Sequence, residues 1–275
     1  MLKTRVITAL ALMAVLLPSL FWLPQMAWAW LIAAFIGVGA GEWGALLGWR
    51  SRARLLLGVA TALLCALLAW TEAAAIGAAG FVPAQTWVFL FYGLSAAFWL
   101  LLIPFWLRGK WSLHGVSGLL VGALVLLPTW LAMVQLRAVG PAVLLAVFAV
   151  VWMADIAAYF AGRRFGKHKL APSISPGKTW EGAYGAIVGV LVYGLIVGHF
   201  FMADVPLPLW VAALLLVTAV SIVGDLFESM LKRKAGIKDS SNVLPGHGGV
   251  LDRIDSLTST LPVAALAWLL FFQRG

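Results

Sequence analysis

The stretch LPLWVAALLLVTAVSIVGDLFE, residues 207–228, decides the fold of this chain. A helix that crosses the hydrocarbon core of a bilayer needs about 20 mostly apolar residues. The stretch supplies this length, and its acids, Asp225 and Glu228, stand close to its end. It therefore predicts a transmembrane helix that carries carboxylates near one membrane surface.

Composition places the whole chain in the same class. Hydrophobic residues make up 63% of it and charged residues 11%, whereas a soluble globular domain is about half apolar and a quarter charged. These proportions exclude a water-soluble fold. The single cysteine, Cys65, excludes an internal disulfide framework. In a membrane protein a net charge of +9 reflects orientation and anionic partners, so we expect no nucleic-acid binding.

Similar apolar runs recur along the chain and predict an all-α, polytopic integral membrane bundle of about nine transmembrane helices. The expected spans are 6–24, 28–48, 54–71, 86–107, 113–135, 140–162, 183–202, 207–228 and 256–272. Pro24 and Gln25 join the first two spans in a tight hairpin. An A-x-A-like site at Ala29 leaves a cleaved signal peptide as an alternative.

Lys and Arg are distributed unevenly between the loops. Of the 19 such residues, all but Arg137 and Arg274 fall in alternate loops, and cytoplasmic loops carry the excess of these residues. We therefore expect an integral protein of the cytoplasmic (inner) membrane whose active site faces the cytoplasm. Residues 136–275 form its catalytic region, with cytoplasmic loops 163–182 and 229–255. Residues 1–135 form scaffold helices with dimer or lipid contacts.

Acids inside the apolar spans are candidate functional residues. Asp155, Asp225 and Glu228 lie near the same end of their spans, and a carboxylate at mid-helix costs about 2.5–3.5 kcal/mol to insert. Such groups face a wet cavity or a partner, and a structural Asp–Arg pair between helices is the alternative. Ser229 and Lys232 follow Asp225 at helical spacing, so the three side chains share one face.

Carboxylates from neighbouring helices can share a metal ion at this membrane surface. Asp252 and Asp255 stand just before the last span. Mg²⁺ takes oxygen ligands, usually one or two carboxylates plus substrate phosphates. We expect Asp225 and Asp252 to hold Mg²⁺, with Asp155 completing the site.

Two polar segments supply candidate phosphate-binding groups. In LPGHGGVL, residues 244–251, the glycines Gly246, Gly248 and Gly249 allow positive φ and a concave array of amides that binds anions. The alternative is a glycine-rich turn beside Lys and Arg side chains that reach the membrane surface. The second segment is Asp155 to Gly182. In it Lys178 is a candidate phosphate-binding residue, and Glu181 is a candidate ligand or a clamp for the substrate.

The segment SMLKRKAGIKDSSNVLPGHGGVLDRID, Ser229 to Asp255, resembles the signature of phosphatidate cytidylyltransferases, also called CDP-diacylglycerol synthases. DIAAYFAGRRFGKHKLAPSISPGKTWEG, Asp155 to Gly182, is similar to an upstream segment of that family. The residues that match the signature are Ser229, Lys232, Arg233, Lys238, Asp239, His247, Gly248, Gly249, Asp252, Arg253 and Asp255. The first 135 residues resemble the family only in hydropathy and length.

The resemblance implies an enzyme that joins CTP to phosphatidate and releases pyrophosphate. It also implies Mg²⁺, a second monovalent cation such as K⁺, a cytoplasm-facing funnel, surrounding membrane lipids and a homodimer. On this basis the catalytic candidates are Lys178, Ser229, Lys232, Arg233, Lys238, Asp239, His247, Arg253 and Asp255. His247 either donates to a phosphate or stabilises its own loop.

Other functions remain open at this stage. A related CTP-dependent enzyme could act on another lipid, and buried acids with glycine-rich breaks also occur in transporters. The acids cluster near one membrane surface and no internal repeat is found, which disfavours a transporter. The D-x₂-D-G-x₂-A-R pattern of CDP-alcohol phosphotransferases is absent.

Overall fold

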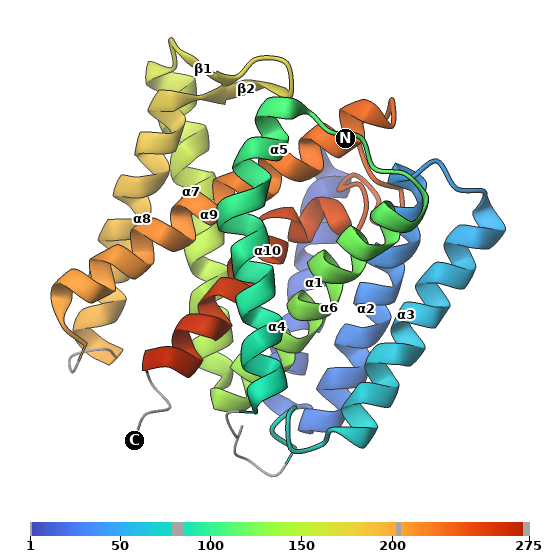
Figure 1. The fold of residues 1–275 in the computed structure, drawn as a ribbon. Helices are drawn as coiled ribbons and strands as arrows, with labels where there is room; N and C mark the ends of the chain where they lie inside the picture. The colour runs from blue at the N-terminus through green and yellow to red at the C-terminus, as the bar shows by residue number, and fades with distance from the viewer. Residues whose placement is uncertain (1, 79–84, 202–204, 272–275) are drawn as a thin grey trace.

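The computed structural model describes residues 2–78, 85–201 and 205–271. Its elements follow the chain in Figure 1 as α1 (Leu2–Trp22), α2 (Gln25–Leu46), α3 (Ser51–Thr71), α4 (Thr86–Ala97), the π-helix η1 (Phe98–Leu102), α5 (Ile103–Gly109), α6 (Gly115–Val139), α7 (Pro141–Phe165), β1 (Lys169–Ala171), β2 (Ser175–Thr179), α8 (Trp180–Phe201), α9 (Leu207–Lys234) and α10 (Leu251–Phe271). Asp204 and Arg274, which the sequence places in outer loops, lie outside the described residues, as do the side chains of Lys3 and Arg5.

The predicted membrane bundle is confirmed. Within the described ranges, 8 helices are long and apolar enough to cross a bilayer, with α4, η1 and α5 counted as one span, and the apolar part of α1 is the shorter stretch Val6–Trp22. The predicted tight hairpin is also confirmed, because α1 ends at Trp22 and α2 begins at Gln25. The expected boundary after residue 135 falls inside α6.

Small residues allow the long helices to approach closely. A Cβ on Gly58 of α3 would lie 2.7 Å from the backbone oxygen of Gly37 in α2, and a Cβ on Gly37 would meet Ala62 at the same distance. Lipid chains are as apolar as the helices, so membrane helices associate through such close packing rather than through the hydrophobic effect. These glycines fix α2 and α3 as a pair.

The fourth span changes its helical geometry in the middle. Pro104 lies in the first turn of α5 and has no N–H to donate to the preceding turn, which accounts for the π-helical turn η1 before it. Phe98, Trp99 and Trp106 of this span pack edge-to-face around Phe227 of α9, at centroid distances of 5.6 to 6.1 Å. The aromatic cluster fixes α9 against the fourth span.

The two ends of the bundle differ in chemistry. The polar end carries the β1–β2 hairpin and the loop 235–250, at the top of Figure 1. At the opposite end Arg137 of α6 donates to the backbone oxygens of Leu20 and Leu23 and to the side-chain oxygen of Gln25. Arg137 thus holds the end of α1 and the start of α2.

Several boundaries at the polar end differ from the sequence prediction. α9 continues to Lys234, so Ser229, Lys232 and Arg233 are helical rather than part of a loop that begins at 229. α10 begins at Leu251, so Asp252 and Asp255 lie inside the helix rather than before it. Acids are favourable in the first turn of a helix because they face its positive dipole end. Within the predicted loop 163–182, β1 and β2 pair in an antiparallel hairpin.

Candidate active site

A polar cavity of about 450 Å³ opens between α7, α8, α9 and the β1–β2 hairpin. Asp155 of α7, Lys178 of β2 and Asp225 of α9 line it, as do the hydroxyl residues Ser221 and Ser256. The sequence therefore identified side chains that the fold brings together from three separate elements. Buried polar atoms at membrane depth line wet cavities, and this cavity is the candidate active site.

Lys178 and Asp225 form an ion pair across the cavity. Both side chains keep about a quarter of their surface exposed, 26% and 25% respectively. Lys178 reaches Asp225 because the hairpin folds back over the end of α9 (Figure 1). Asp225 also accepts a hydrogen bond of 3.2 Å from Ser229 Oγ, one turn further along α9. The lysine is thus held at the rim of the cavity, within reach of an incoming anion.

A second, more buried ion-pair cluster lies beside this cavity. Lys232 Nζ lies 2.6 Å from Asp252 Oδ1 of α10 and 3.2 Å from Glu228 Oε1 of its own helix. Lys232 is only 8% exposed. A buried charge is tolerated only when it is paired and hydrogen-bonded. The cluster therefore joins α9 to α10 at the polar end.

Asp252 is fully engaged within the protein. Its Oδ2 accepts hydrogen bonds from Ser240 N at 2.8 Å, Ser240 Oγ at 2.9 Å and Gly249 N at 2.8 Å. Gly248 has φ +83, and a Cβ there would lie 2.6 Å from Asp252 Oδ2. The two glycines let the loop close onto a carboxylate, and the amide of Gly249 serves this contact rather than an open anion cradle.

Glu42 of α2 is a site residue that the sequence analysis missed. Its carboxylate accepts hydrogen bonds from the hydroxyls of Ser240 and Ser241 and from the amides of Val250 and Leu251. The side chain is 2% exposed. The signal was present, because an acid within an apolar span must find partners. Its partners lie about 200 residues away, so the sequence did not reveal them.

The remaining predicted residues take different positions. Lys238, Asp239 and Gly246 are exposed on the loop. His247 is half-buried, and its Nδ1 has no hydrogen-bond partner among the described residues. Glu181 does not line the cavity; its carboxylate accepts from the backbone N of His168 and lies 2.7 Å from His168 Nδ1.

The arginines near the cavity also differ in their contacts. Arg233 is exposed and donates to Ile174 O in the hairpin at 3.4 Å. Arg163 lines the cavity, and one of its guanidinium nitrogens donates to Tyr159 Oη at 2.8 Å. Arg253 lines a neighbouring cleft together with Asp155, Asp252 and Asp255. Arg163 and Arg253 thus line two neighbouring spaces that share Asp155.

The donor set suits a hard divalent cation that is completed by its substrate. Among the described residues no three His, Cys, Asp or Glu side chains form a closed metal cage. Mg²⁺ usually takes one or two carboxylates, waters and substrate phosphates, so a closed cage is not required. Asp155 and Asp225 face one cavity, and Asp252 would have to exchange Lys232 for a metal ion.

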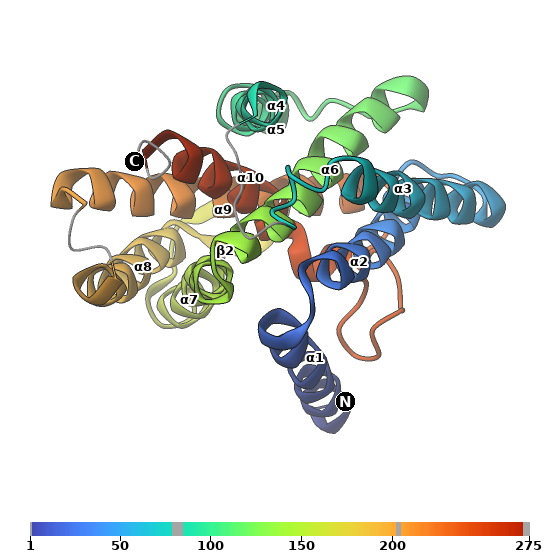
Figure 2. The ribbon, with the colours of Figure 1, turned by 90° about the horizontal axis from the view of Figure 1, so that it is seen from below.

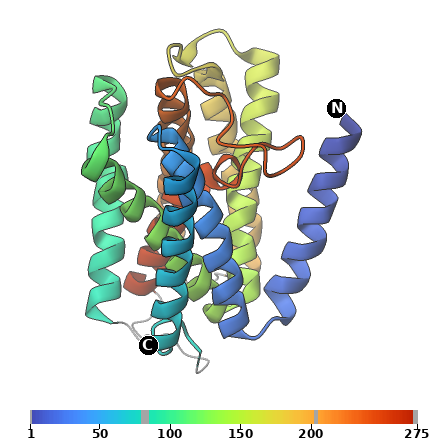
Figure 3. The same ribbon diagram turned by 90° about the vertical axis from the view of Figure 1, so that its right-hand side faces the viewer.

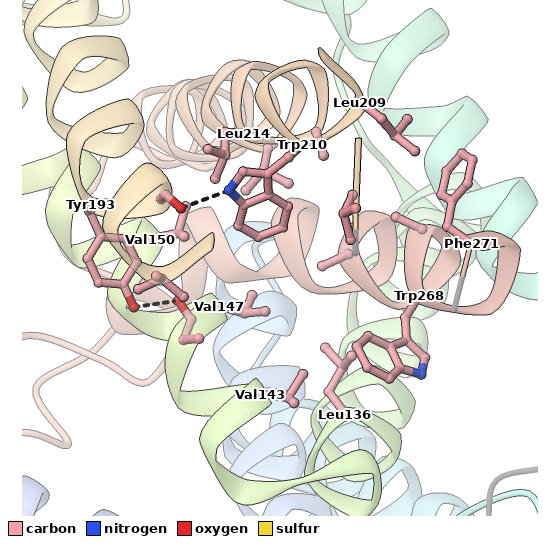
Figure 4. A pocket seen from close by; sticks show the side chains of 18 residues that line it. Leu136, Val143, Val147, Val150, Tyr193, Leu209, Trp210, Leu214, Trp268 and Phe271 are labelled. Carbon is pink, nitrogen blue, oxygen red and sulfur yellow. Dashed lines mark hydrogen bonds between the residues drawn. The ribbon is translucent and has the colours of Figure 1, made fainter. Parts of the chain in front are cut away.

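A separate apolar cavity lies toward the opposite end of α7, α8, α9 and α10 (Figure 4). Its volume is about 160 Å³, and its walls are valine, leucine, alanine and aromatic side chains. The polar groups of Tyr193 and Trp210 donate to the backbone oxygens of Ala146 and Gly194. Because none of the described residues that line it is charged, this cavity is not a candidate for the chemistry.

The sequence is similar to those of known proteins of one family. A family model described as "Cytidylyltransferase family" matches residues 3–271. The phosphatidate cytidylyltransferase of Pseudomonas aeruginosa is 42% identical over 98% of this chain and 97% of its own length. That of Haemophilus influenzae is 36% identical over 95% and 96%, respectively. That of Brucella suis biovar 1 is 53% identical over 46% of this chain and 44% of its own.

Proposed function

Because the chain belongs to the cytidylyltransferase family, we propose that it transfers the cytidylyl group of CTP to phosphatidate. The products are CDP-diacylglycerol, a precursor for phospholipid synthesis, and pyrophosphate. Relatives named phosphatidate cytidylyltransferase align with it over nearly the whole of both chains. The observation that carries the proposal is the cavity in which Lys178 and Asp225 meet Asp155.

The reaction needs positioned charge more than a strong base. The phosphate of phosphatidate is already anionic at neutral pH, so its oxygen can attack the α-phosphorus of CTP directly. A new P–O bond forms as the bond to the β-phosphate oxygen breaks, and the electron pair leaves with pyrophosphate. Because two polyanions must meet, groups that stabilise negative charge lower the barrier. Lys178 and Arg163 stand at the cavity to serve this role.

Other residues contribute by holding the cavity together or by approaching it when substrate binds. Lys232 keeps α9 and α10 in register through Glu228 and Asp252. The Nδ1 of His247 is buried without a hydrogen-bond partner among the described residues, and it would contact a phosphate or the leaving pyrophosphate once the loop 235–250 moves. Arg233, Lys238 and Arg253 would contact the phosphates of the nucleotide or of the lipid, and all three are exposed. Asp239 and Asp255 would orient these basic side chains or bind the second ion, and Ser229 lies beside Asp225.

We include Mg²⁺ in the proposal, with K⁺ as a second cation. Asp155 and Asp225 would hold the divalent ion, and Asp252 would join them on release from Lys232. When bound, the metal neutralises phosphate charge and stabilises the transition state. Lys178 and Lys232 pair with two of these carboxylates and offset the repulsion between the negative charges.

We further propose a cytoplasmic active site in the inner membrane and a homodimeric enzyme. The orientation is supported by Lys and Arg residues at the polar end of the bundle. CTP is available on that side, and phosphatidate is a membrane lipid. The dimer rests on the family resemblance, and size measurement of the purified protein by light scattering tests it.

Purified protein incubated with labelled CTP, Mg²⁺ and phosphatidate tests the function directly. Label should enter the lipid extract as CDP-diacylglycerol, with one pyrophosphate released per lipid formed. Isoprenoid alcohols and ether lipids offered in place of phosphatidate test the nearest alternative. A transporter is tested by solute flux into liposomes without CTP consumption. Absence of labelled lipid from phosphatidate would overturn the proposal.

A further inference from the structure

Thr179 is the last residue of β2 and stands directly between Lys178 and α8. Its side chain is buried, with 6% of its surface exposed. Its Oγ1 accepts a hydrogen bond of 3.1 Å from Gly182 N, in the first turn of α8. A side-chain oxygen at this position caps the helix, because the first amides of a helix have no partner within it. Thr179 therefore fixes the end of β2 to the start of α8.

Three glycines surround the Thr179 side chain. α7 and α8 lie side by side in Figure 2, and the hairpin stands above their ends in Figure 3. A Cβ on Gly162 of α7 would lie 3.0 Å from Thr179 Oγ1, and one on Gly166 would lie 2.9 Å from Thr179 Cγ2. A Cβ on Gly182 would lie 3.2 Å from the same hydroxyl oxygen. We call these residues the glycine cluster; they leave just enough room for the threonine between α7 and α8.

The fixed threonine determines where the neighbouring lysine points. Successive side chains of a strand point to opposite faces. Thr179 faces the glycine cluster, so Lys178 faces the other way, toward its ion-pair partner Asp225 in α9. Because the stem of a lysine is long and flexible, a fixed backbone narrows the range of positions that its ammonium group can occupy.

A second side-chain contact at the base of the hairpin is exposed. The carboxylate of Glu181 lies 2.7 Å from His168 Nδ1, and the His168 side chain is 78% exposed. Exposed ion pairs contribute little to stability because water and salt screen them. Of these two side-chain contacts, the buried one at Thr179 therefore constrains the hairpin more strongly.

We propose that Thr179 is a positioning residue for the transfer reaction. Its hydroxyl caps α8 and its methyl group packs on the glycine cluster, so that Lys178 stays at the polar cavity beside Asp225. This inference rests on the proposed function, and it gives Thr179 an effect on the reaction through Lys178 rather than through contact with a substrate.

Replacing the hydroxyl and keeping the shape tests the proposal. Thr179→Val should lower kcat/KM for CTP about fivefold, which is less than the loss in Lys178→Ala because the lysine is misplaced rather than removed. Thr179→Ser keeps the capping oxygen and should stay within about twofold of the wild type. Thr71→Val is the control, since Thr71 is an exposed threonine at the end of α3 whose hydroxyl donates to Leu67 O.

A double-mutant cycle shows whether Thr179 acts through Lys178. Residues that act as one unit have non-additive effects. Thr179→Val should therefore cause no further loss of kcat/KM when Lys178→Ala is already present. A further fivefold loss on that background would overturn the proposal, and so would wild-type kinetics in Thr179→Val.

Labelling of lysines with an amine reagent, followed by mass spectrometry, tests the positioning without turnover. The ion pair with Asp225 should slow the labelling of Lys178 in the wild type, and Thr179→Val should speed it at least about threefold. The exposed Lys110 should be labelled at one rate in both proteins. Equal labelling rates of Lys178 would contradict the proposal.

Gly162→Ala displaces Thr179 by a second route and serves if Thr179→Val does not fold. Alanine is the better helix former, so α7 should remain folded. The added Cβ would crowd Thr179 Oγ1, and the labelling of Lys178 should again become faster; an unchanged rate would count against the proposal. Failure of the proposed function would appear differently, as no CDP-lipid formation by the wild type, with the labelling rates unaffected.

Discussion

The carboxylate of Glu42 accepts a hydrogen bond of 2.7 Å from the backbone N–H of Leu251, the first residue of α10. It also accepts one of 3.0 Å from Val250 N. A buried acid in α2 thus caps a helix more than 200 residues away and meets its positive dipole end. Because α10 carries Asp252 and Asp255, the N-terminal half of the chain determines where these acids lie.

Replacing Glu42 tests this cap. Glu42→Gln keeps the shape of the side chain but puts an NH₂ donor where an oxygen accepts hydrogen bonds. The free energy of unfolding should fall by about 1–3 kcal/mol, the penalty for buried groups left unpaired. CDP-lipid formation should fall as well, because the loop 235–250 loses its anchor. Thermal unfolding in detergent and the lipid assay measure the two effects.

Glu72→Gln is the matched control for Glu42→Gln. Glu72 is the C-cap residue of α3 at the opposite end of the bundle. This variant should unfold and turn over as the wild type does. If both glutamine variants behave alike, Glu42 has no special role in holding α10.

The buried lysine of α9 should be essential for stability. Lys232→Met leaves Glu228 and Asp252 without their shared cation, and breaking a buried ion pair costs about 3–5 kcal/mol. Lys234, two residues along, is exposed. Lys234→Met should therefore lower the free energy of unfolding by less than about 1 kcal/mol. Unfolding midpoints in the same detergent compare them. Equal midpoints for the two variants would contradict the structural role of Lys232.

Lys178 should matter for turnover rather than for folding. Lys178→Ala removes a cation that pairs with Asp225 at the rim of the polar cavity. Hydrogen bonds to charged groups contribute about 1.5–3 kcal/mol, so kcat/KM for CTP should fall by about tenfold or more. Lys169→Ala, at an exposed position of β1, is the control. Unaltered kinetics of Lys178→Ala would reduce this lysine to an anchor of the hairpin.

The Mg²⁺ dependence of CDP-lipid formation should change when Asp225 is replaced. Chelation of divalent ions should abolish CDP-lipid formation, and added Mg²⁺ should restore it. Asp225→Asn weakens one oxygen ligand, so the Mg²⁺ concentration for half-maximal rate should rise about tenfold, equivalent to about 1.4 kcal/mol. The same titration on Asp155→Asn compares the two carboxylates. A normal Mg²⁺ response in both variants would exclude them as ligands.

The fold class and the polar residues of the candidate site could be predicted from the sequence. Apolar runs of membrane-crossing length identify the spans because the bilayer core has a fixed thickness. The run 207–228 also showed which end of its helix carries the acids. Asp155, Lys178 and Asp225 were selected because ionisable groups beside an apolar span need water or a partner.

The ion-pair and hydrogen-bond partners of these polar residues could not be predicted in the same way. Lys178 pairs with Asp225, and Lys232 with Asp252, although either lysine was an equal candidate for a phosphate. The glycines of the loop were expected to expose amides, but Gly249 closes onto Asp252. Such choices depend on distances between helices that sequence spacing does not contain.

The sequence by itself determined that this chain is a helical membrane protein with a charged surface at one end, because hydropathy and helix length are local properties. Only the tertiary structure decided that Glu42 caps α10, that a strand hairpin brings Lys178 to Asp225, and that three glycines surround Thr179. Each of these depends on contacts between residues far apart in the chain. The energy of a buried charge depends on its neighbours in space, and packing alone supplies them.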